Sequence, residues 1–95
     1  MPEMRFTIRW PDGTREGCYS PSLVIKDYLT PGEDYALSDF LAKSREALTI
    51  ASARVEARYG FPCSLALGQL ARLEQAGRAY ATHPAARVAI EAFEE

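Results

Sequence analysis

The sequence is poor in the residues from which catalytic and metal sites are most often built. It has only two cysteines, Cys18 and Cys63, and one histidine, His83. Two cysteines this far apart form no CxxC unit and no disulfide scaffold, so we expect reduced thiols. No His, Cys, Asp and Glu residues have the spacing of metal ligands, and the glycines occur singly rather than in phosphate-binding loops. We therefore expect neither a metal nor a cofactor.

A strong net charge and a long apolar run are also absent. The formal net charge is -2, so no overall positive field attracts nucleic acid or an anionic membrane. No apolar run approaches the roughly 18 residues of a membrane span, and the N-terminus lacks the pattern of a signal peptide. The sequence predicts a cytoplasmic protein with neither nucleic acid nor membrane as its partner.

The composition is that of a chain that can bury a core. Of its 95 residues, 47% are hydrophobic and 25% are charged, close to the average of soluble globular proteins. This length suits one domain, 1–95, and leaves no room for two independent cores. We predict an α+β fold in which an N-terminal β-hairpin, about 4–20, is covered by three to four helices within about 21–93.

The hairpin is the clearest local pattern. Apolar residues alternate with polar ones along the first strand, as in a half-buried strand: Met4, Phe6, Ile8 and Trp10. The sequence Pro11-Asp12-Gly13 then favours a tight reversal. A type I turn followed by a left-handed Gly13 pairs Ile8 with Glu16 and Phe6 with Cys18. A slip of one residue in the second strand would exchange its two faces, so this register is a specific prediction.

Helical segments are predicted after the hairpin. Residues 21–28 favour a short helix, although Val24 and Ile25 are β-branched and an extended continuation is the alternative. Residues 33–37 are expected to form a connecting loop. Longer helices are predicted from 38 to Gly60, from 64 to 77, and at the end of the chain from 82 to 93.

A cationic surface is expected on the polar face of the hairpin. Arg5, Arg9 and Arg15 lie there with Tyr19, where they could hold an anion or a carboxylate-rich partner. A solvated or internally paired sheet face is the competing interpretation, and it is the commoner one. The free edge of the hairpin is a second candidate, because an extended segment of another chain could pair with it.

Catalytic candidates are few. Cys63 with His83 is the one nucleophile and base pair that the sequence allows, but a thiol in an apolar context and a lone histidine at a helix start are more often structural. The sequence therefore favours a protein without an active site of its own.

Four segments, MRFTIRWPDG, CYSPSLVIKDYL, SREAL and RYGFPCS, resemble a family of short bacterial nitrogen-starvation-response proteins, and the resemblance covers nearly the whole chain. It implies a gene cluster that contains a nitrilase and a radical-SAM protein, linked to nitrile or cyanide nitrogen assimilation. The family brings no catalytic residues to transfer. It implies an accessory role: binding, stabilising or presenting a substrate to an enzyme of the cluster.

Three hypotheses follow. The first is a non-catalytic accessory protein that contacts a protein partner, either a pathway enzyme or a second copy of itself. The second is a small ligand-binding protein or enzyme with its site at a homodimer interface. The third, by analogy of fold alone, is a peptide-presenting partner of a radical-SAM enzyme.

Overall fold

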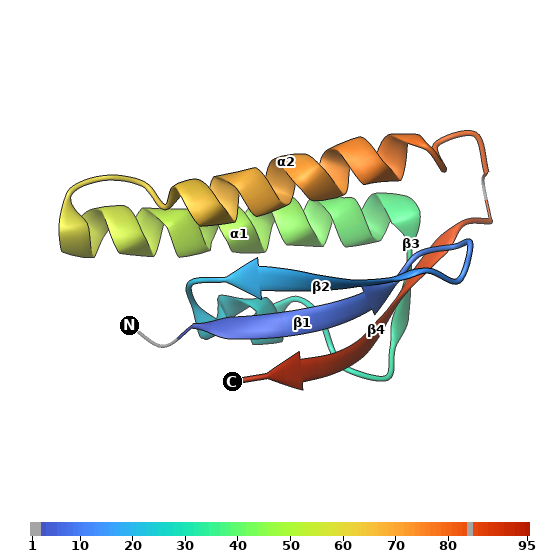
Figure 1. Ribbon diagram of the computed structural model, residues 1–95, viewed down its shortest axis with the longest axis horizontal. Helices are drawn as coiled ribbons and strands as arrows, with labels where there is room; N and C mark the ends of the chain where they lie inside the picture. The colour runs from blue at the N-terminus through green and yellow to red at the C-terminus, as the bar shows by residue number, and fades with distance from the viewer. Residues whose placement is uncertain (1–2, 84) are drawn as a thin grey trace.

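The computed structural model describes residues 3–83 and 85–95. In chain order the elements are β1 (Met4–Arg9), β2 (Arg15–Ser20), the 3₁₀ helix η1 (Leu23–Asp27), β3 (Asp34–Ala36), α1 (Leu37–Tyr59), α2 (Ser64–Arg78) and β4 (Arg87–Glu94). The four strands form one antiparallel sheet in the order β2-β1-β4-β3. The long helices α1 and α2 lie side by side on one side of this sheet (Figure 1). This arrangement confirms the predicted α+β class.

The hairpin has the predicted register. Phe6 pairs with Cys18 and Ile8 with Glu16, and the backbone N–H of Trp10 donates to the carbonyl of Thr14 (2.8 Å). Gly13 has a positive φ of 92°, which a side chain would disfavour. The side chains predicted for the apolar face are all buried: Met4, Phe6, Ile8, Trp10 and Cys18. The polar alternation therefore places the arginines on the opposite, open face.

The two long helices are also where the sequence predicts them. α1 ends at Gly60, whose φ of 91° and N–H bond to the Glu56 carbonyl (2.8 Å) make it a left-handed C-cap. Phe40 and Leu48 of α1 and Leu73 of α2 are fully buried against the sheet. The short helix predicted within residues 21–28 is present as the 3₁₀ helix η1, Leu23–Asp27, which is capped by Ser22, whose side chain accepts from the N–H of Val24.

The predicted C-terminal helix at 82–93 is wrong within the described residues, since 87–94 form strand β4. β4 lies in the interior of the sheet between β1 and β3, where Val88 and Ile90 are buried. A register shift against β1 places a bulge at Glu91, so Phe93 packs on the same side as Val88 and Ile90. The bulge thus produces apolar spacings of two and then three residues, which mimic one face of a helix.

The segment 33–37 contains strand β3 rather than only a loop. Tyr35 pairs with Val88 and Ala36 with Arg87, so β3 forms only because β4 is present beside it. The count of three to four helices is therefore corrected to two α-helices and one 3₁₀ helix in the described residues. The hairpin gains two strands from the same chain, and β1 is not a sheet edge.

Candidate functional site

The predicted cationic face exists, and the structure brings its members together. Arg5 lies opposite Tyr19 across the hairpin, with its guanidinium carbon 5.8 Å from the centre of the ring. Arg9 lies opposite Arg15 in the same register. Burial, followed by a hydrogen bond to the Glu3 carboxylate, raises the pKa of Tyr19 to about 12, so this phenol is neutral at physiological pH.

Much of this positive charge is neutralised within the chain. Both Arg9 and Arg15 pair with Glu91, at N–O distances of 3.3 and 2.6 Å. Glu91 is the residue at the β4 bulge, and the predicted helix at 82–93 gives no reason to expect it between the two arginines, because that position depends on the pairing of β4 with β1. Of the three arginines, Arg5 is the one without an ion pair among the described residues.

The edge of the hairpin is partly occupied by α2. Gln69 accepts a hydrogen bond from the backbone N–H of Tyr19 on β2 (3.0 Å). Arg72 of α2 pairs with Glu16 of the same strand (3.1 Å). Only every second residue of an edge strand points its backbone N–H away from the sheet, so the bond to Gln69 removes one of the few free donors on this edge. This leaves less backbone for an added strand.

The two weak catalytic candidates lie far from each other. Cys63 is in the turn between α1 and α2, while His83 lies beyond α2 at the opposite end of the molecule (Figure 1). Cys63 and His83 therefore form no joint site within one chain. Burial raises the pKa of the second thiol, Cys18, to about 12, which keeps it protonated and unreactive.

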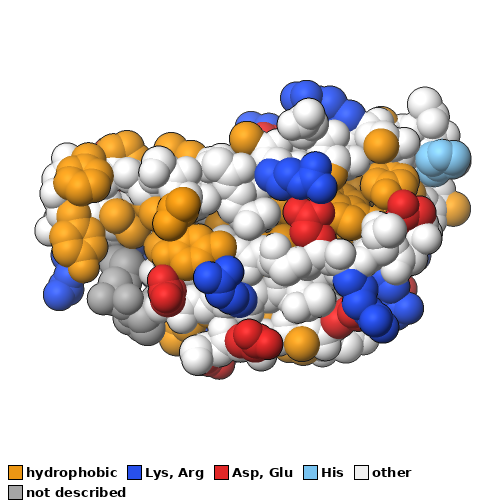
Figure 2. Space-filling model, in the orientation of Figure 1, with side chains coloured by type: hydrophobic (Ala, Val, Ile, Leu, Met, Phe, Trp, Pro, Cys, Tyr) orange, Lys and Arg blue, Asp and Glu red, His pale blue; other side chains and the backbone are white. Residues whose placement is uncertain are grey.

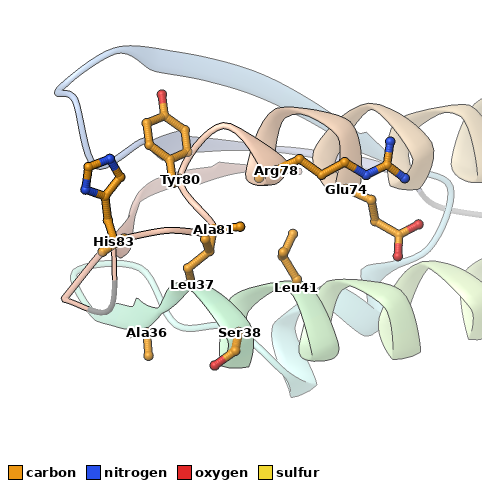
Figure 3. Close-up of a pocket in the computed structure, with 11 residues that line it drawn as sticks. Ala36, Leu37, Ser38, Leu41, Glu74, Arg78, Tyr80, Ala81 and His83 are labelled. Atoms are coloured by element: carbon orange, nitrogen blue, oxygen red, sulfur yellow. The ribbon is translucent and has the colours of Figure 1, made fainter.

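His83 does line a pocket. This pocket has a volume of about 390 Å³ and lies between the beginning of α1, the end of α2 and the segment that leads to β4. Figure 3 shows Leu37 and Leu41 of α1 on one side and Tyr80, Ala81 and His83 on the other. A second hollow of about 440 Å³ adjoins it at the hairpin turn and shares Tyr80 and His83. The sequence gives little sign of either, because their walls come from segments distant along the chain.

An aromatic cluster supports the wall of the pocket. The ring of Trp10 stacks on Tyr80 with centroids 5.7 Å apart and packs edge-on against Phe40 at 6.0 Å. The indole N–H of Trp10 donates to Glu16 (2.9 Å). Partial burial, and then the neighbouring Asp12 carboxylate, raise the pKa of Tyr80. The stacking on Trp10 thus orients the Tyr80 side chain between the two hollows.

A third feature is an exposed apolar end. The turn between α1 and α2 and the helix ends beside it carry the large hydrophobic side chains that are most exposed in the described chain: Tyr59 (54%), Phe61 (65%), Leu65 (65%) and Leu67 (43%). Figure 2 shows hydrophobic side chains gathered at this end of the molecule. We call these four residues the apolar end. The guanidinium carbon of Arg58 lies 5.7 Å from the centre of the Tyr59 ring, so the border of the apolar end carries positive charge.

The described residues contain no group of three or more His, Cys, Asp or Glu side chains able to hold a metal ion. No helix in this part of the chain is both long and apolar enough to cross a membrane. The fold and these surfaces define a small α+β protein with an open polar sheet face, a pocket at one end and an apolar surface at the other.

A family model described as "Nitrogen starvation-induced protein NitG" matches residues 5–93. The chain therefore belongs to this nitrogen-starvation family. No curated protein and no solved structure matches the chain.

Proposed function

We propose that this chain is a non-catalytic accessory protein of a bacterial nitrogen-assimilation pathway linked to nitriles or cyanide, and that it docks its apolar end onto a partner protein. Membership of the nitrogen-starvation family supports the physiological setting. The exposed apolar end is the observation that carries the docking role, because soluble proteins rarely leave several large hydrophobic side chains together in water without a partner.

The shape of the molecule favours a different protein over a second copy as the occupant. The chain measures 40 × 23 × 18 Å, and the apolar end lies at one end of its length. Two copies joined end to end would bury far less than the roughly 800 Å² per partner of a standard interface. A concave apolar cleft on another protein can enclose Phe61 and Leu65 from several sides and bury more of each.

Charge further defines that partner. Arg58 lies beside Tyr59, and Arg5 lies over Tyr19, whose backbone is held by the adjoining helix α2. Arginines next to aromatic rings at an interface pair well with carboxylates. The cleft we propose is therefore apolar at its centre and bordered by Asp or Glu, and Arg5 is the member of the hairpin face most available to it.

The test is co-purification from nitrogen-starved native cells with a variant that removes the docking surface. Phe61→Ser with Leu65→Ser changes two side chains that are 65% exposed, so the fold should survive. We expect the wild type to elute with one pathway protein at fixed stoichiometry, measured by light scattering, and the double variant to elute alone. The matched control, Ala42→Ser with Ala71→Ser, changes exposed positions near the start of α1 and in the middle of α2 and should keep the complex.

Several outcomes would refute the proposal. They are a complex that survives the double variant, a homodimer that depends on the apolar end, and binding of the purified protein to lipid vesicles through Phe61. The first would locate docking elsewhere, and the other two would identify a different occupant.

A further inference from the structure

The pocket at the end of α2 has an apolar body and few polar groups, the usual make-up of a small-molecule site. Leu37, Leu41 and Ala81 supply apolar surface to the 390 Å³ hollow, which the buried Ala86 also lines. α1 and α2 lie so close here that a Cβ on Gly77 would come within 2.9 Å of a Leu41 methyl carbon. The close packing of α1 on α2 therefore fixes the two walls of the pocket relative to each other.

One cation at the pocket has no partner among the described residues. Within residues 3–83 and 85–95, every Lys and Arg except Arg78 has an ion pair, a side-chain hydrogen bond or an aromatic ring beside it. Arg78 lines the pocket from the last turn of α2. An arginine presents a planar set of donors that matches a carboxylate, so its unused donors favour an anionic ligand.

The acidic groups nearby are already engaged. Glu74, which lines the same hollow, pairs with Arg45 of α1. Asp12, at the second hollow, accepts hydrogen bonds from the Thr14 hydroxyl (2.6 Å) and N–H (3.0 Å). Among the residues that line the 390 Å³ pocket, the charge left without an opposite charge is therefore the positive charge of Arg78.

We propose that this pocket binds a small organic carboxylate, with its anionic group on Arg78 and its apolar body against Leu37 and Leu41. The neighbouring hollow past Tyr80 gives room for a longer or branched body. The site lies at the opposite end of the molecule from the apolar end, so its test does not depend on the proposed partner.

The only tryptophan of the chain reports on this pocket, because Trp10 stacks on Tyr80. Hexanoate is titrated into the purified protein while Trp10 emission and the heat of binding are followed, with hexanamide as the neutral isostere. We expect saturable one-to-one binding of hexanoate, and binding of hexanamide that is at least tenfold weaker. Arg78→Gln should weaken hexanoate binding at least tenfold, while Arg78→Lys should recover part of it.

Two variants distinguish binding in the pocket from a general effect of the protein's charge. Arg58→Gln makes the same change of charge at the far end of the molecule and should leave binding unchanged. Ala81→Phe fills the pocket without changing charge and should abolish binding; Ala81 is exposed, so this variant should fold. Equal binding of hexanamide, full binding by Arg78→Gln, or no saturable binding at millimolar hexanoate would each overturn the proposal.

Discussion

The rings of Trp10 and Tyr80 stack with their planes 17° apart, although Trp10 follows the first strand of the sheet and Tyr80 follows the last helix. The contact ties the hairpin turn to the segment that enters β4. It also fixes the shared wall of the two hollows, since Tyr80 lines both. One aromatic pair thus couples the closure of the sheet to the shape of the pocket.

Replacing Tyr80 should weaken this coupling measurably. Stacked aromatic pairs contribute about 0.5 to 1.5 kcal/mol beyond the burial of their surface. We expect Tyr80→Leu to lower the free energy of unfolding by about 1 kcal/mol and to shift Trp10 emission to longer wavelength, as urea denaturation followed by fluorescence would measure. Tyr59→Leu, at a side chain that is 54% exposed, should change neither quantity. Unchanged Trp10 emission in Tyr80→Leu would contradict the coupling.

The interior position of β4 leads to a second prediction. Ile90 is 1% exposed and pairs with Ile8 across the sheet, so Ile90→Ala leaves a cavity in the core. We expect a loss of about 3 kcal/mol in the free energy of unfolding, within the usual range for such truncations. Ala92→Ser, on the exposed side of the same strand, should cost less than about 0.5 kcal/mol. A frayed terminal helix would instead tolerate both changes.

The hairpin, α1 and α2 could be predicted from the sequence because their signals are local. Alternation over Met4–Arg9, the Pro11-Asp12-Gly13 turn and the left-handed Gly60 each act within a few residues. The register followed from the turn, because its length fixes which residues pair.

β3 and β4 could not be predicted in the same way, because their stability depends on pairing between distant segments. The spacing of Val88, Ile90 and Phe93 fits a helix unless the bulge opposite β1 is known. The pairing of Glu91 with Arg9 and Arg15 depends on β4 lying beside β1, so the sequence does not predict it either. The β-branched Val88 and Ile90, two residues apart, were the one local signal for a strand.

The shared carboxylate of Glu91 should contribute modestly to stability. Glu91→Gln removes two ion pairs from a side chain that is 21% exposed, while both arginines remain well exposed to water. We expect a loss below about 1 kcal/mol, because exposed pairs are screened. The difference between wild type and variant should shrink as salt rises from low to high concentration. Glu94→Gln is the control, since Glu94 has no ion pair among the described residues.

Stability should fall at alkaline pH because of Cys18. Burial raises the pKa of its thiol from 9.0 to about 12 in the folded protein. The fold therefore holds the proton more tightly than the unfolded chain does. The resulting contribution to stability is complete below pH 9 and is lost progressively as pH rises from 9 towards 12.

Urea denaturation of the reduced protein at pH 8 and pH 10 measures this loss. We expect the free energy of unfolding to fall by about 1 kcal/mol between these pH values through Cys18, in addition to the smaller effects of the tyrosines. Cys18→Ala should be less stable at pH 8, because it leaves a small cavity beside Phe6, but its stability should fall less between the two pH values. Cys63→Ala keeps the buried thiol and should follow the wild type. If Cys18→Ala and Cys63→Ala lost stability equally, the alkaline sensitivity would have to come from groups other than the buried thiol.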